Sequence, residues 1–262
     1  MRALSIAATG MLAQQTNVEV IANNLANMNT TGYKEQRADF QDLLYQNIEQ
    51  AGAQSSDTGT IVPSGIQLGA GVRTAGVYRI TGQGDLKSTS NPYDMAINGP
   101  GYFRIQMPDG SDAYTRAGNF ALSPQGEIVT DQGYVVAPGI AIPTTATAVS
   151  VNAQGQVQAT IPGQTAQQTV GQFELTRFPN DAGLKAEGDN LFTETASSGS
   201  PQAGVPGSPG YGTLEQGFLE TSNVNAVEEI TSLITAQRAY EMNSKVVTTA
   251  DNMLQMTAQL GG

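Results

Sequence analysis

The chain has 262 residues, enough for one large domain or two ordinary ones, and its 30 Gly and 12 Pro residues favour slim β modules with many turns. The net charge of −11 disfavours nucleic acid as a partner, because neutralising phosphates requires clustered Lys and Arg. Cys and His are both absent, which removes disulfides, thiolate nucleophiles, imidazole bases and the commonest zinc ligands, so we expect no cofactor and no metal.

The first predicted element is a helix from about Ala3 to Met28. Apolar residues recur there every seven positions, which places one stripe along a helix, and that stripe must be buried against another helix. The start of the chain superficially resembles a signal peptide, but the stripe continues far past that stretch, so we interpret it as a retained structural helix without a cleaved leader. The stripe predicts these assembly contacts: Leu4, Met11, Val18, Ile21, Leu25 and Met28.

The next region, residues 33–71, is predicted to be a connector. Tyr33 to Tyr45 could be extended or a short helix. Residues 46–71 have the composition of a flexible linker. Ile61-Val62 and Ile66-Gln67-Leu68 nevertheless give this segment strand character, so we expect a long hairpin completed by neighbouring molecules. No run of the chain approaches the ~18 apolar residues that span a bilayer, so we expect no membrane insertion.

Residues 72–211 are predicted to form a β-rich body. Short alternating runs end in turns such as Pro108-Asp109-Gly110, which is the pattern of antiparallel strands. Nothing recurs at a fixed period, so a solenoid is not expected. The predicted strands cover residues 101–107, 127–130, 149–151, 156–158 and 172–178.

The last region, residues 212–262, is predicted to be a return connector and a second long helix. That helix should start near Asn225, with Ser222, Asn223 and Asn225 as possible N-caps. Its seven-residue row adds four assembly contacts, namely Leu233, Tyr240, Val247 and Leu254. We therefore expect an α+β fold in which the helix of residues 1–32 pairs with the terminal helix in a coiled-coil-like layer, with the β-rich body between them in the sequence.

The tract from Ala22 to Asn27 could, on pattern alone, be a capped helix end with surplus amides. However, residues 9–34, 91–103, 114–120 and 214–241 together resemble the signature stretches of bacterial flagellar rod and hook proteins. Tyr93 departs from that pattern, because an aliphatic residue is more usual there. The matching positions are Asn23, Asn24, Leu25, Asn27, Gly32, Asn98, Gly99, Gly101, Asn223, Asn225, Gln237 and Arg238.

Within this family, residues 52–56 and 63–73 resemble the segment typical of distal rod members, while hook and proximal rod members stay as alternatives. The resemblance implies a structural subunit of a helical homopolymer, a drive shaft that transmits torque toward the hook. It also implies export as an unfolded chain, a place in the basal body across the periplasm, and contacts with proximal rod, hook, P-ring and L-ring proteins.

An enzyme of another class, a secreted cell-wall hydrolase, would need two carboxylates in a cleft, for example from Asp94, Asp109 and Asp112. Each of these lies within two residues of Gly or Pro in a predicted turn, where Asp serves the backbone, so we expect no catalytic residues. Arg238 and Glu241 could pair between neighbouring subunits or simply form a solvated helix face.

Overall fold

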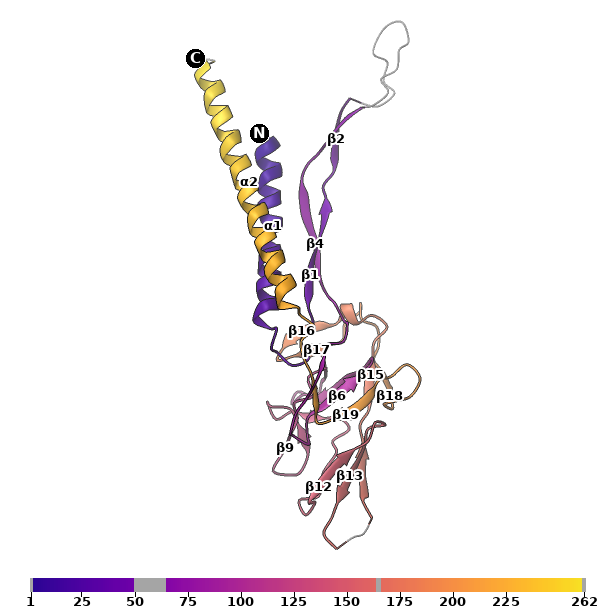
Figure 1. The fold of residues 1–262 in the computed structure, drawn as a ribbon. Coiled ribbons are helices and arrows are strands. Elements are labelled where there is room, and N and C mark those ends of the chain that lie inside the picture. Colours follow the sequence, from indigo (N-terminus) through magenta and orange to yellow (C-terminus); the bar gives the residue numbers. More distant parts are fainter. Residues whose placement is uncertain (1, 50–64, 164–165, 261–262) are drawn as a thin grey trace. The chain divides into compact units, whose positions relative to one another are not determined.

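A computed structural model describes residues 2–49, 65–163 and 166–260 (Figure 1). It has a helix near each end and strands between them, so the predicted α+β class is confirmed. The chain forms two compact units. The helical unit comprises residues 1–25, 36–78 and 225–262, and the β unit comprises residues 26–35 and 79–224.

The helical unit contains the two helices, α1 (Arg2–Ala26) and α2 (Ala226–Leu260). Helix α2 begins where predicted, because the Asn225 Oδ1 accepts a hydrogen bond from the Val227 amide at 3.1 Å and caps the first turn. Two acidic residues in that turn, Glu228 and Glu229, complement the positive end of the helix dipole.

The prediction that the first helix reaches Met28 is wrong. The helix ends at Ala26, because the chain then forms a turn in which the Thr30 amide donates to the Asn27 carbonyl at 3.1 Å. Met28 therefore lies outside the helical stripe, in the β unit.

Two short two-stranded sheets complete the helical unit. One pairs β1 (Gln36–Asp42) with β4 (Val72–Arg79), and the other pairs β2 (Tyr45–Glu49) with β3 (Ile66–Gly69) in antiparallel register. The chain after Tyr33 is thus extended rather than helical. Ile61-Val62, which contributed to the predicted hairpin, lies outside the described residues.

The β unit is built on a nine-stranded sheet. Its strands are β7 (Tyr102–Gln106), β8 (Asp112–Thr115), β9 (Ala121–Leu122), β10 (Ile128–Val129), β11 (Val135–Val136), β15 (Leu175–Arg177), β16 (Lys185–Gly188), β17 (Leu191–Thr193) and β18 (Gln202–Gly204). The main path runs β16-β17-β8-β7-β11-β10-β9, and β15 pairs with both β7 and β18.

Three smaller sheets and one short 3-10 helix, η1 (Asp181–Gly183), accompany the nine-stranded sheet. The three-stranded sheet has the order β12-β13-β14, and the two pairs are β19-β6 and β20-β5. These strands are β5 (Leu86–Ser88), β6 (Met95–Asn98), β12 (Ala148–Val151), β13 (Gln156–Thr160), β14 (Gln168–Gln172), β19 (Thr213–Gln216) and β20 (Phe218–Glu220).

Four of the five strands predicted in the body are found. The fifth, predicted as one strand over residues 172–178, is wrong, because β14 ends at Gln172 and β15 begins at Leu175. Between them the fully buried Phe173 donates its amide to the Gly155 carbonyl at 2.8 Å, while the chain passes from one sheet to another.

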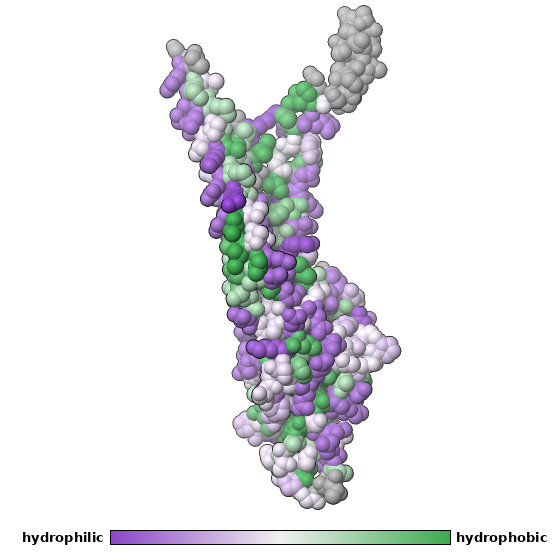
Figure 2. Space-filling model, in the orientation of Figure 1, coloured by the Kyte–Doolittle hydropathy of each residue, from purple (hydrophilic) through white to green (hydrophobic). Residues whose placement is uncertain are grey.

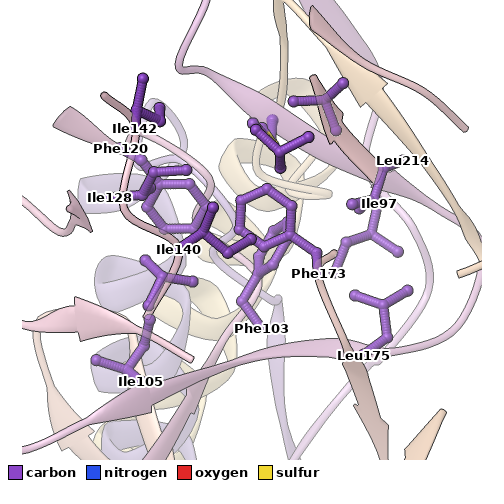
Figure 3. Packing of buried hydrophobic residues seen from close by; sticks show 14 of the residues in the cluster. Ile97, Phe103, Ile105, Phe120, Ile128, Ile140, Ile142, Phe173, Leu175 and Leu214 are labelled. Carbon is purple, nitrogen blue, oxygen red and sulfur yellow. The ribbon is translucent and has the colours of Figure 1, made fainter. Parts of the chain in front are cut away.

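Strand β7 lies between two hydrophobic clusters because its side chains alternate between faces. Phe103 and Ile105 belong to the large cluster, where the ring centroid of Phe103 lies 5.0 Å from that of Phe120 (Figure 3). Tyr102 belongs to a smaller cluster, in which it packs edge-on against Phe178.

Candidate assembly surface and the family-motif residues

Helices α1 and α2 pack side by side and antiparallel (Figure 1). Asn24 near the end of α1 donates from Nδ2 to the Glu229 Oε1 near the start of α2, at 3.0 Å. Further along the pair, a Cβ built on Gly10 would lie 2.9 Å from the Asn243 Nδ2, so the two helices approach closely there. The buried positions are mainly small, including Ala7, Ala13 and Ala236 on the two helices.

The sequence-predicted stripe is only partly covered by this pairing. Ile21 is buried, while Tyr240 and Leu254 remain exposed. The other helical members of the stripe are half-buried, namely Leu4, Met11, Val18, Leu25, Leu233 and Val247. Their role as contacts between copies stays a prediction.

Helix α2 also carries apolar side chains away from α1. Val227 is 73% exposed, and Ile230 and Ile234 follow at spacings of three and four residues, which places all three on one helix face. Further along, Met242, Val246, Met253 and Met256 are exposed as well. Figure 2 shows such apolar patches on the surface of the helices. We call Val227, Ile230 and Ile234 the outer apolar face of α2.

Asn24, from the family motif, ties three elements of the helical unit together. Its Nδ2 donates to the Gln36 carbonyl at 2.8 Å as well as to Glu229, and its Oδ1 accepts from the Gln36 amide at 2.9 Å. The side chain is 1% exposed, so it joins α1, β1 and α2 in a buried position. Among its motif neighbours, Asn23 is exposed and Asn27 accepts a hydrogen bond from the Thr30 hydroxyl.

A buried ion cluster in the β unit gathers other motif positions. Glu220 is fully buried and accepts from the Lys34 Nζ at 2.5 Å through Oε1 and from the Arg116 Nε at 2.8 Å through Oε2. Gly84 adds a backbone amide at 3.0 Å from the Glu220 Oε1. Two cations and one anion thus share an interior site where the carboxylate has partners on both oxygens.

Arg116 extends this cluster to the body motif. Its Nη1 donates to the carbonyls of Gly99 and Gly101 at 2.8 and 2.7 Å. Asn98, the preceding motif residue, donates from Nδ2 to the Glu215 Oε1 at 2.8 Å. The motif therefore supplies backbone carbonyls to a buried guanidinium.

Two more motif residues support the same region. The Gly32 amide donates to the Glu220 carbonyl at 2.8 Å, and Gly32 has φ +68, a conformation that favours glycine. Asn223 accepts from the Glu35 amide at 2.7 Å and donates to the Ile80 carbonyl at 3.0 Å. Asn223 therefore links the segments that contain Glu35 and Ile80, which are distant from it in the sequence.

Burial shifts the pKa values of titratable groups in and beside the cluster. Burial lowers the pKa of the Lys34 ammonium, although Glu220 opposes that shift. Burial likewise raises the pKa of the Tyr102 phenol and of the Asp181 carboxyl. These groups line a cavity of about 320 Å³ beside the cluster, together with Arg116.

Sequence reasoning did not predict this ion cluster. Lys34 and Arg116 lie inside the stretches that resemble the flagellar family, but nothing in the sequence pairs them with Glu220. The one signal in the sequence is Glu220 itself, a single carboxylate that directly follows the apolar residues Phe218 and Leu219 of a short strand and could therefore be buried.

The other proposed site residues have simpler surroundings. Gln237 and Arg238 are exposed on α2. Asp94 accepts from the Asn91 side chain, Asp109 accepts from the Ser111 amide, and Asp112 lies 3.4 Å from the Arg104 Nη1.

The described ranges of the chain include no cluster of three or more acidic side chains arranged to hold a metal ion. Neither helix, over its described length, is apolar and long enough to cross a membrane.

Three family models match the chain in the regions that form this architecture. "Flagella basal body rod protein" matches residues 4–34, "Flagellar hook protein FlgE/F/G D1 domain" matches residues 96–159, and "Flagellar basal body rod FlgEFG protein C-terminal" matches residues 215–260. The flagellar basal-body rod protein FlgG of Caulobacter vibrioides is 60% identical over 260 residues, covering 99% of both chains. The chain belongs to the FlgG family of flagellar basal-body rod proteins.

Other relatives extend this result across bacteria. FlgG proteins of Agrobacterium fabrum and Bacillus subtilis are 53% and 39% identical, and each alignment covers 99% of both chains. The predicted resemblance to flagellar rod proteins, and to the distal rod member in particular, is confirmed. This FlgG family member is a structural subunit of the flagellar basal body, in the distal rod.

Proposed function

We propose that copies of this rod subunit polymerise through the helical unit. Helices α1 and α2 of each copy pack against those of its neighbours and form a tube that transmits torque toward the hook. Contacts that repeat without closing into a ring generate a filament, and close-packed interfaces that cannot slide make it stiff.

The observation that carries this proposal is the outer apolar face of α2. A helix whose apolar residues extend beyond one stripe belongs in an interior, yet within the described part of the chain Val227 stays 73% exposed, and Ile230 and Ile234 stay 47% and 46% exposed. Fully burying an exposed side chain of this kind contributes about 1.5–3 kcal/mol. Ile230 and Ile234 are already about half covered, so each adds only part of that amount, and the three together still favour contact.

The test replaces Ile230 and Ile234 with Asp in the full-length protein. Electron microscopy of the purified wild type should show filaments, and the variant should show none, because each contact would bury two unpaired carboxylates. The Tyr near-UV circular dichroism of the β unit should be unchanged. As a matched control, Ile230→Val with Ile234→Val keeps the face apolar and should still assemble. Filaments from the Asp variant would refute the mechanism.

We also propose that β2 and β3 bridge neighbouring copies and limit bending. Both strands carry exposed apolar side chains, including Tyr45, Ile48 and Leu68, and an isolated two-stranded sheet is marginal in water. Deleting residues 46–71, or replacing those three side chains with Thr at constant length, should lower the flexural rigidity of filaments in electron micrographs. Unchanged rigidity in both variants would refute this role.

The proposed partners at the ends of the polymer are proximal rod and hook proteins, and those around it are P- and L-ring proteins. Support comes from the family and from the net charge of −11, which suits a solvated outer surface. Export without a cleaved signal peptide and passage across the periplasm belong to the same proposal. Neutralising the half-buried Glu174 and the exposed Glu187 and measuring co-purification of ring proteins tests the ring contact.

We propose a structural rather than an enzymatic role. The support is that Asp94, Asp109 and Asp112 each serve a local contact with a neighbouring Asn, Ser or Arg. Release of soluble fragments from peptidoglycan by the purified protein would overturn this view and favour a hydrolase.

A further inference from the structure

A groove of about 340 Å³ lies between α1 and α2 in the helical unit. The half-buried Val18 and the ring of Tyr240 provide its apolar part, while Glu19 from α1 and Glu241 from α2 are exposed beside them. Two amide side chains and no basic residue complete the lining, which is Gln15, Val18, Glu19, Gln237, Tyr240 and Glu241. An apolar part next to two carboxylates matches a long side chain with a cationic end.

Arginine fits this groove better than lysine. Its three-carbon stem packs on apolar atoms, and its planar fork donates to carboxylates and stacks on an aromatic ring. Among the described residues, an arginine already lies over a tyrosine ring in two places. The Arg37 Cζ lies 5.0 Å from the centroid of Tyr78, and the Arg177 Cζ lies 5.9 Å from that of Tyr211.

We propose that the groove is a socket for Arg238 of a second copy of this chain. The inference rests on the proposed polymerisation, because a homopolymer brings the basic residues of one copy to the groove of another. Arg238 is exposed, and none of the ion pairs found among the described residues includes it. It lies between Gln237 and Tyr240 in the sequence, so a neighbouring α2 with a small axial offset presents it at the level of the groove.

The other basic residues of the helices fit less well. Arg2 is 13 residues before the groove residue Gln15, about 20 Å along the helix at 1.5 Å per residue, and needs a large offset between copies. Lys245 ends in a compact, strongly hydrated ammonium, which lacks the fork that two carboxylates and a ring favour. Charge complementarity therefore selects a second copy as the occupant and Arg238 as the inserted side chain.

A charge swap tests the pair. Glu19→Arg and Arg238→Glu are made singly and together. Glu19 is chosen over Glu241 because Glu241 lies three residues after Arg238 on α2, where the two side chains could interact within one helix. Each single variant should raise the critical concentration for filament formation by about tenfold or more, since two like charges then meet at the contact. The double variant should return to within about threefold of the wild type. Far-UV circular dichroism checks that helix content is unchanged in all four proteins.

Each outcome has a defined meaning. Restoration in the double variant supports the socket, and so does a wild-type critical concentration that rises with salt. Singles that assemble like the wild type, or a double that does not recover, would overturn it. Recovery with Lys245→Glu or Arg2→Glu in place of Arg238→Glu would overturn the assignment of Arg238. If the wild type and the Ile-to-Val control form no filaments, the proposed function fails and this inference fails with it.

Discussion

Lys34 and Glu220 are 186 residues apart in the sequence and form a buried ion pair, with 2.5 Å between the Lys34 Nζ and the Glu220 Oε1. Arg116 binds the other carboxylate oxygen. This geometry explains why family-motif glycines at positions 32, 99 and 101 meet here, since each contributes a backbone group to the members of the cluster. A site of this kind holds the segments of the β unit in place.

Replacing Glu220 with Gln should strongly destabilise the β unit. The substitution leaves two buried cations without a counter-charge, and breaking a buried ion pair in this way costs about 3–5 kcal/mol. Urea unfolding followed by Tyr near-UV circular dichroism measures the loss. Glu187→Gln is the matched control, because it removes the partner of Lys185 from an exposed pair, where solvent screening leaves little stability to lose. Equal losses in the two variants would contradict the role of the cluster.

Replacing Gly32 with Ala should also destabilise the β unit, by about 1–3 kcal/mol. The backbone there has φ +68, and the new Cβ would lie 2.7 Å from the Ala117 amide nitrogen, where no flexible side chain can yield. Gly110→Ala separates the cost of a positive φ from the cost of the steric contact, because Gly110 has φ +84 but open space around it. The same urea unfolding should show the smaller loss for Gly110, and a neutral Gly32→Ala would disprove the close contact.

The elements that sequence reasoning predicted well are those with a local signal. The start of α2 follows from the possible N-cap Asn225, and β7 follows from alternation between Gly101 and the turn at Pro108. The end of α1 was misplaced, because the seven-residue row continues to Met28 while the backbone already turns at Asn27.

The parts that sequence reasoning missed depend on contacts between distant residues. The pairing of Glu220 with Lys34 and Arg116 depends on several strand pairings at once, and no spacing in the sequence reports them. Similarly, small residues such as Ala7 and Ala236 occupy buried helix positions. The seven-residue row used for the prediction was made mainly of large apolar residues and left these positions out. An apolar stripe shows that a helix has a face to bury. How deeply each residue of that face is buried depends on the neighbouring element that packs against it.

Replacing Asn24 with Ala should loosen the helical unit by about 2–3 kcal/mol, because a buried amide that makes three hydrogen bonds is lost and the Gln36 backbone groups lose their partners. Hydrogen exchange of the α1, β1 and α2 amides measures this change. Gln15→Ala is the control, since Gln15 is exposed and bonds only to Glu19 on its own helix among its described contacts. Protection that falls equally in both variants would contradict the role of Asn24.

Replacing Asp181 with Asn should stabilise the protein at neutral pH. Burial raises the pKa of this carboxyl above its ordinary value of 3.8, against the attraction of Arg177, Arg116 and Lys34. The folded state therefore binds the proton more tightly than the unfolded state. The wild type loses stability as the pH rises from about 3.8 through the raised pKa, and the loss is complete above that pKa.

The advantage of Asp181→Asn should accordingly be largest at pH 7 and vanish below the ordinary pKa, where both states of the wild type are protonated. Asp109→Asn gives the opposite sign, because hydrogen bonds from Ser111 lower the pKa of Asp109. That variant should be less stable than the wild type at pH 7 and equal to it in acid. Urea unfolding of all three proteins at pH 7 and in acid decides between these signs. A penalty for Asp181→Asn at pH 7 would mean that the attraction of the three cations outweighs the cost of burial.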